Sequence, residues 1–290
     1  MSAMPEIRHR LRVVEDTRKI TRAMYLISSA KMKRAMAMHD RNEVFFHRVR
    51  SDVLHIVDYT DAENESPFFT LREGGRAAYL IIAGDKGMCG AYNDDVLRLA
   101  ERTIAQCAHK QVFLFTVGHM ASAYFERKGM EPDVRYLHVS QNPQLYSARD
   151  ITLEMCELYE AGELDEVYVV YTHMESTTRI VPTVMRLLPI VREDYAHVEQ
   201  LHPHPPDLIF HPSPEEVLAR LVTQLLIGLT YTACVQAYAS EHCARMTAMD
   251  ASTRNADEML GKLRLELNRA RQAAITQELT EIIAGANSVR

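Results

Sequence analysis

The chain has 290 residues, of which 47% are hydrophobic and 25% charged, and its formal net charge is −6. This composition excludes a disordered chain, and the length allows one large domain or two modest ones. No run approaches the roughly eighteen consecutive apolar residues of a membrane-spanning helix, so we expect no direct insertion into a membrane.

The cysteine pattern and the N-terminus bear on the compartment. Five cysteines form no CxxC pair, which predicts reduced thiols in a cytoplasmic setting. Residues 1–12 lack an apolar signal core and an organelle presequence, which favours a bacterial origin.

The N-terminal sixty residues read as one helix. The first seventy residues contain no glycine, and Pro5 stands near the start, where proline is tolerated. Apolar residues recur there at spacings of three and four, which predicts a helix over 1–62 with a narrow seam, meaning an apolar stripe that pairs with another helix. The seam residues are Ile7, Leu11, Val14, Thr17, Ile20, Met24 and Ile27.

The middle of the chain changes in character. Short apolar runs rich in branched and aromatic residues alternate with polar, helix-forming stretches, which predicts a βαβ arrangement and a mostly parallel sheet over 75–195. The expected strands are 77–83, 111–117, 134–139 and 167–172, with 180–191 as a further candidate.

The last part begins with a proline-rich linker, predicted at 196–214. From Glu215 to Arg290 there is no proline, so an uninterrupted helix over 215–290 would be on the order of 110 Å long and needs a partner. Its apolar residues form a coiled-coil seam with an offset, namely Leu260, Leu263, Leu267, Ala270 and Ala274, then Ile275, Leu279, Ile282 and Ala286. The two terminal helices can cover each other's apolar seams only by pairing antiparallel.

A glycine-rich loop follows the first expected strand. Residues 84–93 (GDKGMCGAYN) have GxxGxxG spacing, which matches neither the GxGxxG nor the GxxxxGK[ST] phosphate loop. Two interpretations stay open: a phosphate-binding loop, or a tight turn whose glycines are set by backbone geometry. Cys89 is either a nucleophile or, as we favour in the absence of an identifiable base, a structural thiol.

Three histidines in the proline-rich stretch suggest a metal tract. They are His202, His204 and His211, and they lack neighbouring cysteines or a helical HxxxH pair. We therefore favour an exposed linker over a metal site.

The N-terminal helix is basic inside an acidic protein. Between Arg8 and Arg34 nine positive residues stand against Glu15 and Asp16. This pattern predicts either a solvated helix face or contact with an acidic protein partner. Nucleic acid is disfavoured, because interleaved aromatic residues are missing.

Four segments, in order along the chain, resemble the gamma subunit of F-type ATP synthases. The two terminal ones are long and specific, and the loop differs from the common family form SDRGLCGAYN at Gly84, Lys86 and Met88. The segments are IRHRLRVVEDTRKITRAMYLISSAKMKRA (7–35), GDKGMCGAYN (84–93), SEHCARMTAMDASTRNA (240–256) and ITQELTEIIAGANS (275–288).

The resemblance implies an α/β fold class, in which a long antiparallel coiled coil of the N- and C-terminal helices accompanies a Rossmann-like α/β domain with a mostly parallel sheet. It implies a central rotor shaft inside a hexamer of alpha and beta subunits, with further contacts to the epsilon subunit and the c-subunit ring. It also implies a peripheral location at the cytoplasmic face of the bacterial cell membrane, without catalytic residues, cofactor, metal or nucleic acid on this chain.

Site residues follow from the matched motifs. Met24 matches a position near an acidic loop of beta, and Arg271 with Gln272 matches a pair that catches a loop of a beta subunit. Thr276, Glu278 and Glu281 match polar contact positions in the C-terminal signature. For all of these the alternative is an ordinary polar flank of a coiled coil.

A function of another class is a stand-alone nucleotide-dependent enzyme that uses the α/β domain, with a phosphate site at Gly84–Gly90. The two hypotheses differ in a simple observable, since the enzyme hydrolyses nucleotide alone and the rotor assembles with alpha and beta subunits.

Overall fold

The computed structural model describes residues 3–60, 66–72, 74–107, 109–191 and 210–288. The chain forms two compact units, one of residues 1–28 with 245–290 and the other of residues 29–244. The helices α1 (Ala3–Tyr59) and α5 (Pro214–Ser288) contribute to both units. Most of the predicted linker at 196–214, with His202 and His204, lies outside the described residues.

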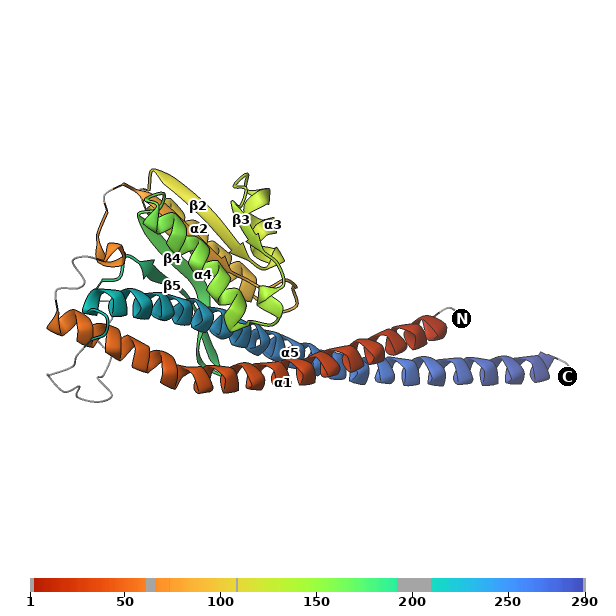
Figure 1. Ribbon diagram of the computed structural model, residues 1–290. Coiled ribbons are helices and arrows are strands. Elements are labelled where there is room, and N and C mark those ends of the chain that lie inside the picture. The colour runs from red at the N-terminus through yellow and green to blue at the C-terminus, as the bar shows by residue number, and fades with distance from the viewer. Residues whose placement is uncertain (1–2, 61–65, 73, 108, 192–209, 289–290) are drawn as a thin grey trace. The chain divides into compact units, whose positions relative to one another are not determined.

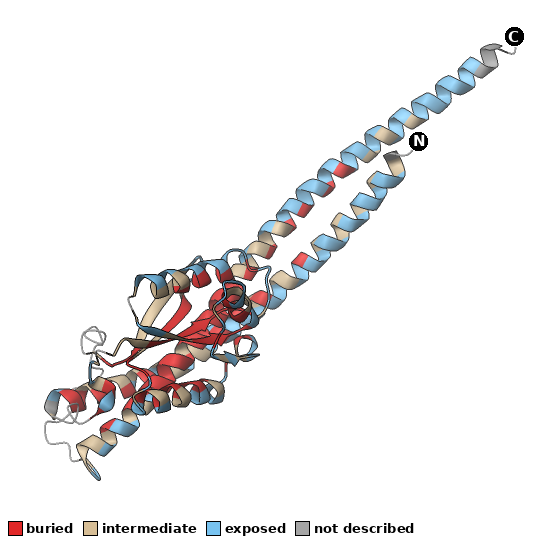
Figure 2. Cartoon of the chain, turned by 90° about the horizontal axis from the view of Figure 1, so that it is seen from above, coloured by how far each residue is buried: buried red, intermediate tan, exposed pale blue. Residues whose placement is uncertain are grey.

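In the first unit, the start of α1 lies beside α5, and the C-terminal end of α5 extends past it (Figure 2). Hydroxyl oxygens of Thr21 and Thr253 are 2.8 Å apart, and Arg18 donates to Asp257 at 2.9 Å. Because residue numbers rise along one helix as they fall along the other, the helices run antiparallel, as predicted.

The predicted seam of α1 is wrong at three positions in this unit. Thr17, Ile20 and Ile27 are exposed, whereas Thr21 and Ser28, which directly follow the two isoleucines, are buried. The seam therefore repeats at seven residues through small polar side chains, which an apolar pattern does not detect. On α5, Leu260 and Leu263 are buried as expected.

In the second unit, the described strands form a sheet in the order β3-β2-β1-β4-β5 (Figure 1). Strands β1 to β4 are parallel where they pair, and β5 is antiparallel to β4, which confirms the mostly parallel sheet. The strands are β1 (Arg76–Ile82), β2 (Gln111–Val117), β3 (Val134–Tyr136), β4 (Glu166–Ser176) and β5 (Arg179–Leu188). The strand predicted at 134–139 is shorter, because His138 adopts a left-handed φ of 67° and the 3-10 turn η3 (Val139–Gln141) follows.

Strand β1 shows how the sheet is covered on both faces. Ala78, Leu80 and Ile82 pack in one cluster with α4 (Leu145–Glu160) and with the parts of α1 and α5 that belong to this unit. Alternate residues, Ala77, Tyr79 and Ile81, pack in a second cluster with α2 (Tyr92–Gln106) and α3 (His119–Arg127). Successive side chains of a strand point to opposite faces, so a strand covered on both sides reads as a continuous apolar run.

The apolar half of α5 is accounted for by this packing. By length and composition α5 contains a stretch apolar enough to cross a membrane, and 56% of that stretch is buried inside the protein. Leu218, Val222 and Leu225 of α5 belong to the cluster on the sheet. A helix in the core of a protein has the same composition as a membrane span, and burial distinguishes the two.

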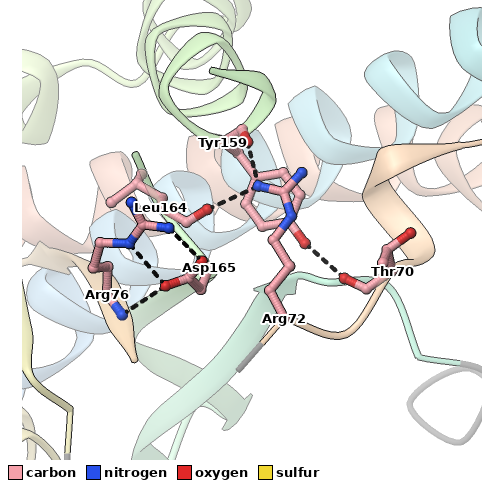
Figure 3. Close-up of polar contacts among 6 residues, drawn as sticks. All are labelled: Thr70, Arg72, Arg76, Tyr159, Leu164 and Asp165. Carbon is pink, nitrogen blue, oxygen red and sulfur yellow. Dashed lines mark hydrogen bonds and ion pairs between the residues drawn. The ribbon is translucent and has the colours of Figure 1, made fainter. Parts of the chain in front are cut away.

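A polar network fastens the amino end of β1 (Figure 3). Asp165, which is buried, accepts hydrogen bonds from the Arg76 side chain at 2.9 and 3.0 Å and from its backbone N–H at 2.9 Å. Arg72 lies over the Tyr159 ring and donates to the carbonyls of Tyr159 and Leu164. The segment before β1 is therefore tied to the end of α4 and the start of β4.

We expect Gly228→Ala to destabilise the second unit. A Cβ at Gly228 of α5 would overlap the buried ring of Phe46 on α1, and overpacking of this kind costs about 1–3 kcal/mol. Gly261→Ala on the same helix is the matched control, since a Cβ there meets nothing within 4 Å and alanine should add about 0.5–1 kcal/mol of helix stability. Urea denaturation followed by circular dichroism measures both; equal effects of the two substitutions would contradict the close packing at Gly228.

Candidate functional site

The coiled coil of the first unit has a definite register. In addition to the pairs Thr21–Thr253 and Arg18–Asp257, Arg264 donates to Glu15 at 3.3 Å. Continued at about 1.5 Å per residue to the start of α1 at Ala3, this register reaches roughly residue 275 of α5.

Beyond that point α5 continues without α1 beside it. Ile275, Leu279 and Ile282 are 46%, 55% and 68% exposed, and Figure 2 shows this end of the helix as exposed. The second part of the predicted seam is therefore not paired in the described part of this chain, because the partner helix starts too late to cover it. A row of exposed apolar side chains on a helix indicates a surface that another chain covers.

The predicted site residues fall into two places. Arg271, Gln272, Thr276, Glu278 and Glu281 all lie exposed on α5, within about 15 Å along its axis. The Thr276 hydroxyl donates to the Gln272 carbonyl at 2.9 Å, and the Gln277 side-chain amide donates to the Glu281 carboxylate at 3.0 Å.

Met24 stands apart from the other five. It is half-buried on α1 and, by the register, opposite about residue 250, so it lies roughly 30 Å along the axis from Arg271. The predicted site residues thus lie in two regions at different heights along the coiled coil rather than in a single pocket.

The basic segment of α1 is partly neutralised within the unit. Arg18 pairs with Asp257 and Lys19 with Asp16, at 2.9 and 3.0 Å, and all four side chains are largely exposed. Exposed pairs of this kind contribute about 0–1 kcal/mol. Lys19 and Arg22 line a shallow groove on this face. The face therefore keeps exposed positive charge that an acidic partner would meet.

The glycine-rich loop at 84–93 is a closed turn. The Asn93 side chain accepts from the backbone N–H of Gly84 at 2.9 Å and donates to the Lys86 carbonyl at 3.3 Å. Cys89 is buried, and its sulfur lies 3.2 Å from the Asn93 amide nitrogen. Gly90 has a φ of 59°, which glycine adopts without strain. These contacts favour the interpretation of Cys89 as a structural thiol and of the loop as a turn.

The crevice beside this loop is filled by the protein itself. Parallel α/β sheets bind ligands at the carboxyl ends of strands where the strand order reverses, here between β1 and β4. In this unit Ser240 of α5 donates to the Thr172 carbonyl, and Tyr92 donates to the Ala237 carbonyl, both at 3.0 Å. A Cβ at Gly84 would lie 3.0 Å from the carboxyl carbon of Glu241. A carboxylate where a phosphate would have to sit disfavours the nucleotide-dependent enzyme.

Titratable groups near the crevice are held in their ordinary charge states. For Asp85, burial acts to raise the pKa, but hydrogen bonding, led by the backbone N–H of His119 at 2.8 Å, outweighs it and lowers the pKa. Burial raises the pKa of the Cys243 thiol. Asp85 therefore stays ionised and does not act as a general acid. Cys243 stays protonated and is not an activated nucleophile.

Metal ligands do not gather either. Within the ranges that the structure describes, no three His, Cys, Asp or Glu side chains come together as a metal site requires. His211 is exposed.

Sequence reasoning missed the polar residues that connect the elements. Thr253 and Asp257 set the register of the coiled coil, and Gln236, Ser240 and Glu241 fill the crevice. One signal was available, because Thr21 and Ser28 continue the heptad spacing from Val14. Gln236 and Ser240 lack such a signal, since their partners are backbone atoms far away in the sequence.

Known proteins match this chain over nearly its whole length. The family described as ATP synthase matches residues 3–289. The ATP synthase gamma chain of Ruminiclostridium cellulolyticum is 40% identical over 99% of this chain and 98% of its own length. That of Caldanaerobacter subterraneus subsp. tengcongensis is also 40% identical, over 97% of this chain and 98% of its own length.

Solved structures share the fold. A chain of the Euglena gracilis mitochondrial ATP synthase, solved as an OSCP, F1 and c-ring assembly, aligns with a TM-score of 0.68 at 16% identity, over 99% of this chain and 94% of that one. A chain from the central stalk and c-ring of the Tetrahymena thermophila enzyme gives 0.62 at 22% identity, over 80% and 98%. From the match along its entire length to relatives at 40% identity, the chain belongs to the family of ATP synthase gamma chains.

Proposed function

We propose that this chain is the central rotor shaft of an F-type ATP synthase, which couples transmembrane ion flow to ATP synthesis and hydrolysis on alpha and beta subunits. The observation that carries the proposal is the full-length match to ATP synthase gamma chains, in a protein whose two terminal helices pair as an antiparallel coiled coil. The chain is a non-catalytic subunit.

The coupling follows from symmetry. Two paired helices have no threefold axis, whereas a sleeve of alternating alpha and beta subunits has approximate threefold symmetry. At any angle the three catalytic sites therefore meet different faces of the shaft. Because each site contacts a different face of the shaft, each is shifted toward a different conformation. Rotation brings each face of the shaft to the next site in turn, so the three sites change conformation in sequence.

The exposed end of α5 supports an enclosing partner. Ile275, Leu279 and Ile282 project where α1 no longer accompanies the helix, so their apolar surface stays in contact with water unless another chain covers it. The alpha and beta hexamer is the partner that we assign to this segment.

Beta subunits also account for the polar site residues. In our proposal Arg271 and Gln272 catch a loop of one beta subunit, while Thr276, Glu278 and Glu281 make further polar contacts. Met24 and the basic face of α1 lie near an acidic loop of beta. The exposure of the five residues on α5 is compatible with these roles.

The α/β domain faces the other partners, the epsilon subunit and the ring of c subunits. This arrangement places the chain at the cytoplasmic face of the bacterial cell membrane as a peripheral subunit that does not insert into the bilayer. Ion transport is then a property of the assembled machine, to which this chain contributes mechanical linkage.

Reconstitution tests the proposal against the enzyme alternative. The chain is co-expressed with alpha and beta subunits, and the mass and ATPase activity of the purified complex are compared with those of the isolated chain. We expect a complex with a single copy of this chain, active in hydrolysis, and an isolated chain without activity. Nucleotide hydrolysis by the isolated chain, or failure to join the complex, would refute the proposal.

A further inference from the structure

The carboxyl edge of the sheet holds α5 in the position where related folds hold a ligand. The residues responsible are Gln236, Ser240 and Cys243, which we call the α5 latch. Gln236 accepts from the Met174 backbone N–H at 3.0 Å, Ser240 donates to the Thr172 carbonyl at 3.0 Å, and the Cys243 thiol donates to the Thr177 carbonyl at 3.1 Å.

The spacing of the latch fits its geometry. Residues four and three apart lie on one face of a helix, so Gln236, Ser240 and Cys243 form a row along α5. Their partners are backbone atoms of β4 and of the turn that leads to β5. Backbone groups of a sheet are fixed by the ladder, so a row of bonds to them opposes both sliding and axial rotation of the helix.

A second side of α5 is held as well. Tyr92, at the start of α2, donates from its hydroxyl to the Ala237 carbonyl at 3.0 Å, and Glu241 packs against Gly84 after β1. Ser240 and Tyr92 are almost fully buried. The helix is therefore gripped between the ends of β1 and β4, in the crevice that a nucleotide would occupy in another protein of this architecture.

We infer that the latch residues are positioning residues through which torque passes between the α/β domain and the shaft. This inference rests on the proposed function. Because α5 is one continuous helix from Pro214 to Ser288, a twist applied at the latch is carried by its backbone into the coiled coil. Apolar packing holds the helix against the sheet but is non-directional, whereas hydrogen bonds to fixed backbone atoms define an angle.

The experiment measures torsional stiffness in the assembled complex. Alpha and beta subunits are immobilised without nucleotide, a bead is attached to the exposed face of α2, and its thermal angular fluctuation is recorded. The test variant is Gln236→Ala with Ser240→Ala. The matched control is Thr223→Ala with Gln224→Ala on the same helix, where Thr223 bonds to the Ala219 carbonyl of its own helix and Gln224 is exposed.

We expect the angular variance of the latch variant to rise by up to about twofold, because the bonds of Gln236 and Ser240, two of those that hold α5, are removed and their contributions add. The control should match the unmodified chain. Gln236→Glu, which keeps the acceptor oxygen, should restore the narrower distribution in combination with the natural Ser240.

Three results are distinguishable. A latch variant that assembles and folds, judged by circular dichroism, but fluctuates as the unmodified chain does would overturn the inference and leave the rotor function standing. Equal broadening in the control would also overturn it. If the unmodified chain fails to assemble, the proposed function itself is refuted. A variant that does not fold is replaced by Gln236→Ala alone, to which the same criterion applies.

Discussion

Replacement of both Arg271 and Gln272 by alanine should reduce the coupling between ATP hydrolysis and ion pumping by roughly fivefold or more, the lower range of coupling free energies between protein sites. Both side chains are exposed on α5, so they are available to a beta subunit. A guanidinium and an amide can hold a partner loop in one orientation through several hydrogen bonds, which alanine cannot replace. ATP-driven pumping in vesicles, expressed per ATP hydrolysed, measures the effect.

The fold should not be affected by this change, because exposed substitutions alter stability by about 0.5 kcal/mol or less. Lys262→Ala with Glu266→Ala is a control on the same helix, at exposed positions nearer the α/β domain. Unchanged hydrolysis and pumping in the assembled Arg271 and Gln272 variant would remove these two residues from the proposed beta contact.

Asp165→Asn should lower the free energy of unfolding of the second unit by about 1.5–3 kcal/mol, the range for hydrogen bonds to a charged group. The Asp165 side chain is 2% exposed and accepts from both the side chain and the backbone of Arg76. The loss stays below that of a fully buried pair, because the Arg76 side chain is 38% exposed and regains water. Asp150→Asn, at an exposed position of α4, is the control for urea denaturation.

The same pair predicts a pH dependence. The side-chain hydrogen bond from Arg76 holds the pKa of Asp165 below its ordinary value. A depressed carboxyl pKa contributes stability above the unfolded value of about 4, and that contribution is lost as pH falls through the folded pKa. The stability difference between the unmodified chain and Asp165→Asn should therefore be constant near neutral pH and shrink below about pH 4. A difference that grows as the solution is acidified would contradict this assignment.

The positions of the helices and strands were the part of the fold that could be predicted from the sequence. Strand 111–117 matches β2 to the residue, and the first helix ends at Tyr59 within the predicted range. Such elements follow from local periodicity, which one stretch of sequence contains in full. The strand at 134–139 was too long, because a left-handed residue at His138 depends on the turn that follows rather than on hydrophobicity.

Contacts between elements that lie far apart in the sequence were harder to predict. The seam of α1 was misplaced at Ile20 and Ile27 because Thr21 is buried by a hydroxyl partner, Thr253, that lies far away along the chain. The latch on α5 was missed for the same reason, since the partners of Gln236 and Ser240 are backbone atoms of β4. Conversely, the site residues on α5 came from motif resemblance, and the contacts that we propose for them lie on other subunits.

Direct observation of rotation tests the central claim most sharply. Alpha and beta subunits in complex with this chain are fixed to a surface, a bead is attached to the exposed face of α2, and ATP is added. A shaft that turns inside a threefold sleeve predicts rotation in one direction, with pauses that follow the symmetry of the sleeve. Sustained ATP hydrolysis by the complex with a bead that does not turn would contradict the account.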